Sequence, residues 1–218
     1  MGLLRGRIGW ATLALMGPFV LLATATFSAR VFDGQSAAIG GFGRSMPFPE
    51  LSTVGAFAYN LMTFGYGEEV GWRGFALPRL QTRHSALGAT VLLTLGWALW
   101  HWPLFLYRPG YTSMDAAGVA GWFLSLLTGG VVLTWLYNES RGSILVVALF
   151  HAAVDVIFTA DSASQLEVNM TGALITVSGA LVLVLAGPRF LSRKGKVIRT
   201  RDGRVTGFLL RDSRIVMC

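Results

Sequence analysis

The stretch YGEEVGWRGF, residues 66–75, places two carboxylates and a guanidinium in a sequence that is otherwise apolar enough to lie in a lipid bilayer. An ionisable group at membrane depth costs about 2.5–3.5 kcal/mol on insertion scales, so it is normally found facing the interior of a helix bundle or a wet cavity. Glu68, Glu69 and Arg73 therefore mark a candidate functional site in a helical membrane protein.

Apolar segments on both sides of this stretch predict an all-α, polytopic transmembrane helical bundle. The 218 residues are 53% hydrophobic and 13% charged, with a mean hydropathy of +0.57, which excludes an ordinary soluble domain. A helix needs roughly 20 apolar residues to cross a bilayer. We expect about six spans, of which the fifth is short: 8–29, 52–76, 86–106, 119–137, 142–158 and 170–187.

The first span has an alternative interpretation as a cleaved signal peptide. Arg5 and Arg7 precede its apolar run, and Ala29 could end a small-residue cleavage site. The apolar run is longer than a usual signal core, which favours a retained span.

The single cysteine, Cys218, offers no disulfide framework and no cysteine-based zinc site.

Basic residues predict the orientation. If all six segments cross, 15 of the 18 Lys and Arg residues fall on the side of the two termini and three fall opposite. This asymmetry predicts that both termini are cytoplasmic. The net charge of +7 is concentrated in a tail at 188–218, which we interpret as a solvated anchor near anionic headgroups. It carries no aromatic-basic interleaving, so we expect no nucleic-acid partner.

The two glutamates are expected to divide their work. Adjacent residues on a helix point about 100 degrees apart, so they cannot face the same water. Glu69 and Arg73 are four residues apart and can pair on one face, which leaves Glu68 free for a cavity, where it could act as a general base. The alternative is a buried ion network that only fixes helix packing.

Two further polar clusters lie inside later apolar spans. His101 follows WALW at 97–100, and a lone histidine there is more often a hydrogen-bonding link between helices than a ligand. His151 and Asp155 are four apart, so they share a helical face, and the carboxylate could fix the tautomer of the imidazole. His84, in a predicted loop, is expected to be solvated.

The order of these motifs resembles the CPBP family. The motifs are Glu-Glu-x-x-x-Arg at 68–73, aromatic-x-x-x-His at 97–101 and His-x-x-x-Asp at 151–155, on successive spans. The family groups type II CAAX prenyl endopeptidases with bacteriocin-processing and immunity (Abi) membrane proteases. The resemblance covers about residues 51–158 and divides the chain into 1–50 with the first span and an extracytoplasmic loop, 51–158 as the catalytic core, 159–187 with the last span, and the tail.

The resemblance implies roles for these side chains. Glu68 would activate a water for attack on a peptide carbonyl, supported by Glu69 and His101, while His151 and Asp155 would orient groups or stabilise the oxyanion. Zinc held by Glu68, His101 and His151 is one expectation, since the family is classed among metalloproteases, and a metal-free glutamate mechanism is the other.

Two positions depart from the common motifs. Trp97 stands where Phe is common, a change that keeps an aromatic wall and should be tolerated. Asp155 stands where Asn is frequent, and an ionised Asp cannot donate to an oxyanion, so bracing His151 suits it better.

The sequence thus predicts an intramembrane endopeptidase that acts on a peptide or membrane-protein substrate near the cytoplasmic half of the bilayer. Two other hypotheses use the same residues. A proton-coupled transporter would use them as a relay, although no inverted repeat is found. A non-catalytic membrane adaptor would keep them as packing. The sequence predicts neither the substrate sequence nor the oligomeric state.

Overall fold

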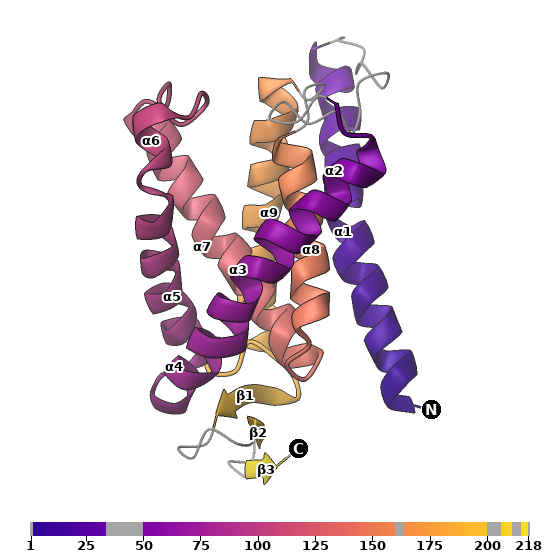
Figure 1. The fold of residues 1–218 in the computed structure, drawn as a ribbon, viewed down its shortest axis with the longest axis vertical. Helices are drawn as coiled ribbons and strands as arrows, with labels where there is room; N and C mark the ends of the chain where they lie inside the picture. The colour runs from indigo at the N-terminus through magenta and orange to yellow at the C-terminus, as the bar shows by residue number, and fades with distance from the viewer. Residues whose placement is uncertain (1, 34–49, 160–163, 200–205, 211–214, 218) are drawn as a thin grey trace.

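The computed structural model describes residues 2–33, 50–159, 164–199, 206–210 and 215–217. Most of the predicted loop at 30–50, and Cys218, lie outside these residues. Helices dominate, and three short strands follow them (Figure 1). In chain order the elements are α1 Gly2–Asp33, α2 Thr53–Asn60, η2 Leu61–Tyr66, α3 Gly67–Glu69, η3 Val70–Ala76, α4 Leu77–Arg83, α5 Ala86–His101, α6 Leu104–Tyr107, α7 Ala116–Glu139, α8 Ile144–Phe158, α9 Gln165–Ala186, β1 Gly195–Arg199, β2 Thr206–Leu210 and β3 Ile215–Met217.

The predicted all-α membrane bundle is confirmed, and the number of spans is approximate. Among the described residues, four helices are long and apolar enough to cross a membrane, namely Ile8–Val31, Ala86–Tyr107, Ala116–Glu139 and Gln165–Ala186. The predicted fifth span corresponds to α8, which has 15 residues. The predicted second span corresponds to a helical path built from several shorter pieces.

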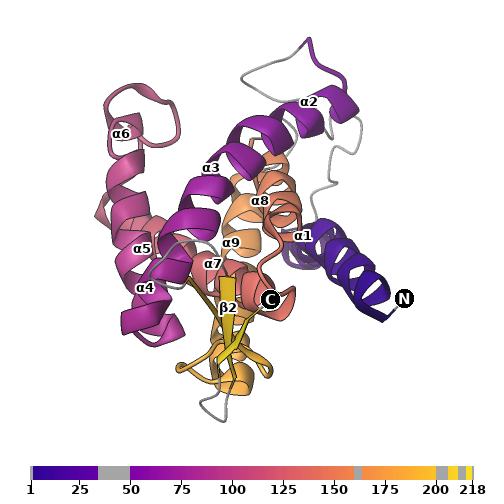
Figure 2. The same cartoon turned by 60° about the horizontal axis from the view of Figure 1, so that its bottom comes forward.

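This second helical path runs obliquely across the bundle from α2 to α4 (Figures 1 and 2). It begins after Ser52, whose Oγ accepts a hydrogen bond from the backbone N–H of Gly55 at 3.1 Å, and it ends where His84 turns to an extended backbone. The residues between its pieces keep right-handed helical angles, so the path does not break. Two stretches, η2 and η3, are wider π-helical turns, which occur frequently at functional sites.

A glycine sets how closely this path approaches α8. A Cβ added at Gly65 would lie 2.6 Å from the backbone oxygen of Ala148, a distance that real Cβ atoms do not adopt. Only glycine allows the two backbones to meet there. Because Gly65 is about one turn from Glu69, and Ala148 about one turn from His151, the close approach also brings these two side chains together.

Small and hydroxyl residues hold the other helices together, as is usual where lipid removes the hydrophobic drive for association. The hydroxyls of Thr90 on α5 and Thr134 on α7 share a 2.8 Å hydrogen bond. At Gly179 on α9, an added Cβ would lie 2.6 Å from the backbone oxygen of Thr128 on α7.

Side-chain caps start the helices, such as the Ser85 hydroxyl that accepts from the Gly88 N–H at 3.0 Å.

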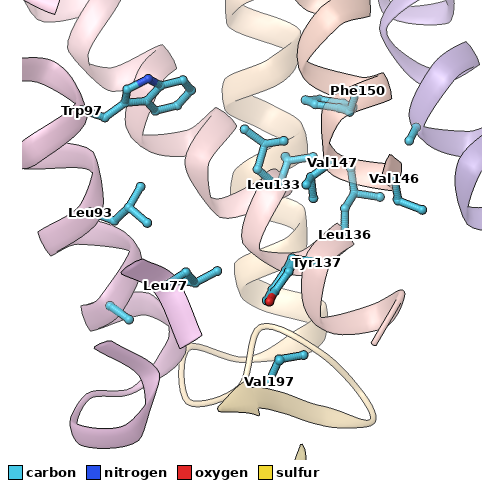
Figure 3. Packing of buried hydrophobic residues seen from close by; sticks show 13 residues of the cluster. Leu77, Leu93, Trp97, Leu133, Leu136, Tyr137, Val146, Val147, Phe150 and Val197 are labelled. Atoms are coloured by element: carbon cyan, nitrogen blue, oxygen red, sulfur yellow. The ribbon is translucent and has the colours of Figure 1, made fainter. Parts of the chain in front are cut away.

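A cluster of buried apolar residues joins α4, α5, α7, α8 and β1 (Figure 3). Trp97 lies at one end of this cluster and is only 5% exposed. The ten members labelled in the figure are Leu77, Leu93, Trp97, Leu133, Leu136, Tyr137, Val146, Val147, Phe150 and Val197.

The tail differs from the predicted solvated anchor. Strands β1, β2 and β3 form an antiparallel sheet at the end of the bundle where α4 ends and α5 begins (Figure 2). Asn138 on α7 accepts from the Val197 N–H at 3.0 Å, and Gln81 on α4 donates to the Val197 carbonyl at 2.7 Å. The Lys196 ammonium donates to the backbone oxygen of His84 at 2.6 Å. Burial lowers the pKa of Lys196, and nearby Arg189 lowers it further. The described start of the tail is therefore packed against the bundle.

Candidate active site

A buried ion pair links the oblique helical path to α8. Glu69 and Arg73 are both fully buried, and Arg73 Nη1 donates to Glu69 Oε1 at 2.7 Å, so the predicted contact is present. The same carboxylate oxygen lies 2.9 Å from Nδ1 of His151 on α8. Two residues that are 82 positions apart in the chain are thus joined through one carboxylate.

The partner that orients His151 is not the one that the sequence predicted. Because the Glu69 carboxylate accepts hydrogen bonds, Nδ1 of His151 carries the proton, and Nε2 is the nitrogen that remains for other partners. Asp155 was expected to fix this tautomer, yet its Oδ2 lies 3.6 Å from Nε2, beyond hydrogen-bond distance. Asp155 Oδ2 has no hydrogen-bond partner among the described residues. A carboxylate from another helix therefore takes the role assigned to the one on the same helix.

The two glutamates differ in exposure as the sequence predicted. Glu69 is fully buried, whereas Glu68 is partly exposed. Glu68 Oε2 accepts a 2.9 Å hydrogen bond from the indole N–H of Trp97 on α5. Glu68 Oε1 forms no hydrogen bond with the described residues, so this oxygen remains available to a water or a substrate.

His101 bonds within its own helix and forms no link between helices through that bond. Its Nδ1 donates to the backbone oxygen of Trp97 at 2.8 Å, which leaves Nε2 with a lone pair when the imidazole is neutral. The ring packs edge to face against Trp97 and Trp122, with centroids 5.7 and 6.0 Å away. Phe105 and Tyr111 pack in turn on Trp122. Burial raises the pKa of Tyr111, so its hydroxyl stays neutral at physiological pH.

Trp97 is where the three sequence motifs meet, and sequence reasoning treated it only as an aromatic wall. Its ring lies edge to face with His101 and, at 5.3 Å, with His151. The Arg73 guanidinium lies 4.7 Å from the ring centroid. A tryptophan differs from other apolar aromatics by its N–H donor, and that donor was the signal that could have identified it.

Several polar atoms behind the site are buried without a protein partner among the described residues. They include Glu69 Oε2, Arg73 Nε and Nη2, and Thr94 Oγ1. The space next to Gly130 on α7 adjoins two of them, since an added Cβ there would lie 2.9 Å from Thr94 Oγ1 and 3.8 Å from Arg73 Nη2. Gly130 therefore leaves room for the Thr94 hydroxyl, whereas an added Cβ would make only an ordinary contact with the guanidinium.

The described side chains are not gathered into the zinc site that the resemblance implied. Among the described residues, no group of three His, Cys, Asp or Glu side chains could hold a metal ion. Glu68 Oε1 and the Nε2 atoms of His101 and His151 are outside the hydrogen bonds described above, but the three side chains do not form such a group. We therefore derive no step through a metal.

The polar cluster lies away from the end that carries the tail. Helix α5 begins beside the tail, where the Ala86 N–H donates to the Arg189 carbonyl, and it ends at His101. At 1.5 Å per residue, His101 is roughly 20 Å from that end, and Asp155 is roughly 15 Å along α8. By the same measure His151 is roughly 10 Å along α8, so the cluster extends from about 10 to 20 Å from the end that carries the tail.

Known proteins share the segment that holds this cluster. The family model described as type II CAAX prenyl endopeptidase Rce1-like matches residues 50–157. A relative from Methanococcus maripaludis, named CAAX prenyl protease 2, is 33% identical over 122 residues, which cover 53% of this chain and 45% of the relative. The chain thus aligns with less than half of that protein. From the match and its three ordered motifs, we conclude that the segment 50–157 of this chain belongs to the CPBP family.

Proposed function

We propose that this chain is an intramembrane endopeptidase in which Glu68 activates the water that hydrolyses a peptide bond. The observation that carries the proposal is the difference between the two glutamates. Glu69 is fully buried and bound by Arg73 and His151, whereas Glu68 is partly exposed and keeps one oxygen outside these contacts. A general base needs such an oxygen within reach of a water.

The reaction would use the other groups for positioning and charge stabilisation. As the water oxygen bonds to the carbonyl carbon, Glu68 takes one proton, and negative charge develops on the carbonyl oxygen. The C–N bond then breaks and the proton passes to the leaving nitrogen. His101 presents Nε2 as an acceptor that can orient the water, and His151 presents Nε2 toward the developing charge, to which its protonated form donates. Asp155 lies beside that nitrogen.

The substrate is proposed at the level of a peptide or membrane protein cut within the bilayer. The name of the Methanococcus maripaludis relative suggests a prenylated carboxyl-terminal peptide as the first candidate. The wider family adds bacteriocin leaders and other membrane-protein segments. A panel should therefore contain a farnesylated CAAX peptide, the same peptide without the lipid, and an apolar helical peptide.

The test is a cleavage assay with purified protein in liposomes and mass spectrometry of the products. Glu68→Gln should lower the rate by at least about 100-fold, because general base catalysis contributes roughly 10²–10⁴. Glu50→Gln, which changes an exposed glutamate just before the helical path, should leave the rate unchanged. Full activity in Glu68→Gln would overturn the proposal. Proton flux into the liposomes without cleavage would favour a transporter.

A chelator arm of the same assay tests zinc. We propose a metal-free mechanism, because the three expected ligands are not gathered into one group. The rate should survive exhaustive chelation, with metal content measured in the treated sample. Loss of activity that zinc restores would show that the ligands rearrange around a metal.

We also propose that both termini are cytoplasmic, which the distribution of basic residues supports. The resemblance of the motifs to those of bacterial family members suggests a bacterial plasma membrane.

A further inference from the structure

We infer that Trp97 is a positioning residue for Glu68, whose carboxylate it holds through an indole N–H so that one oxygen stays directed at the water. The inference rests on the proposed role of Glu68 as general base. It assigns to Trp97 a function that a purely aromatic wall does not have.

The hydrogen bond has the features of a fixed support. The indole Nε1 can only donate, and it donates to Glu68 Oε2 at 2.9 Å. A bond to an ionised acceptor is roughly twice as strong as one between neutral groups. Trp97 is buried, so its N–H would lose its hydrogen-bond partner if the carboxylate turned away. The pairing therefore favours one orientation of the carboxylate.

Packing holds the indole itself in place. Trp97 belongs to the apolar cluster of α5, α7 and α8, as Figure 3 shows. The guanidinium of Arg73 lies 4.7 Å from its ring centroid, and both histidine rings meet it edge to face. A side chain restrained from several directions cannot follow a carboxylate that moves. Positioning by such restrained groups is what supports a reactive geometry.

Glu68 needs a support of this kind more than Glu69 does. Glu69 has two side-chain partners. Glu68 has one among the described residues, which is the side chain of Trp97. The backbone around Glu68 lies between two π-helical turns, η2 and η3. The hydrogen bond from α5 therefore fixes a carboxylate for which the described residues of its own helix provide no side-chain partner.

Phenylalanine at position 97 would keep the ring but lose the donor. The expectation that Phe and Trp are interchangeable there considers only the packing of the aromatic ring and not the N–H donor. The 2.9 Å contact predicts instead that Trp97→Phe lowers kcat by about 10- to 100-fold while KM stays within about twofold, because a hydrogen bond to a charged group is lost and no substrate contact is.

A matched control separates this effect from general damage to α5. Trp100 lies three residues further along the same helix and is 65% exposed, so Trp100→Phe makes the same chemical change outside the site. Trp100→Phe should leave kcat and KM unchanged. An equal loss in both variants, or an unchanged kcat in Trp97→Phe, would overturn the inference.

Infrared difference spectroscopy supplies a readout that does not need catalysis. Trp97→Phe should shift one carboxylate stretching band relative to the unchanged protein, and the shift should vanish when both samples also carry Glu68→Gln. No shift would overturn the inference even if Glu68 is the base. A shift together with full activity of Glu68→Gln would show that the contact exists while the proposed function fails.

Discussion

Alanine at Gly65 should disconnect the two halves of the site. The added Cβ would lie 2.6 Å from the Ala148 carbonyl, and ordinary contact begins at 3.4 Å, so the helices must separate by about 0.8 Å. Applied one turn away, this separation lengthens the Glu69 to His151 bond from 2.9 to about 3.7 Å, beyond hydrogen-bond range. We expect at least about a 10-fold loss of cleavage and a loss of about 1–3 kcal/mol in unfolding free energy.

The assay compares cleavage and thermal unfolding of Gly65→Ala with those of Gly71→Ala. Gly71 lies on the same helical path, and an added Cβ there meets nothing within 4 Å. Its replacement should therefore be neutral or slightly stabilising, because alanine favours helix. If the two variants behave alike, the close approach at Gly65 does not hold the site together, and the reasoning is refuted.

Three further predictions concern charge, space and orientation. Arg73→Met should cost about 3–5 kcal/mol in denaturant or thermal unfolding, because it removes the cationic partner of the buried Glu69 carboxylate and leaves it only the hydrogen bond from His151; adding Glu69→Gln should recover stability but not cleavage. Gly130→Ala places a methyl group 2.9 Å from a threonine hydroxyl and should lower the melting temperature, whereas Gly129→Ala, with 3.6 Å of room, should not. Cys218, the single thiol, should react with a membrane-impermeant maleimide only after cells are opened; labelling of intact spheroplasts would place the tail outside.

Local sequence rules predicted the contacts within one helix. Glu69 and Arg73 pair because residues four apart share a helical face, and the spans follow from apolar length. The burial of Glu69 and the partial exposure of Glu68 also follow from their angular separation on the helix. Such predictions need no knowledge of how the helices are arranged.

Contacts between helices were the part that the sequence could not supply. The link from Glu69 to His151 depends on the oblique path and on the close approach at Gly65, and neither has a local signature. The i,i+4 rule therefore favoured Asp155 as the partner of His151, although a carboxylate from another helix lies closer.

The tail shows a similar limit. Its basic residues suggested a solvated anchor, but the buried amides of Gln81 and Asn138 on distant helices bind its backbone. A polar residue in an apolar span signals that some partner exists, and it does not say which segment provides it. The same limit hid the donor role of Trp97, because the indole N–H acts across 29 positions of sequence.

Isotope labelling of the products tests most directly whether Glu68 directs water at a peptide bond. Cleavage in H₂¹⁸O should place one ¹⁸O atom in the new carboxyl group of the amino-terminal fragment, and Glu68→Gln should abolish this product while the protein remains folded and inserted. Products that form without the label, or labelled product that Glu68→Gln forms at the same rate as the unchanged protein, would contradict the account.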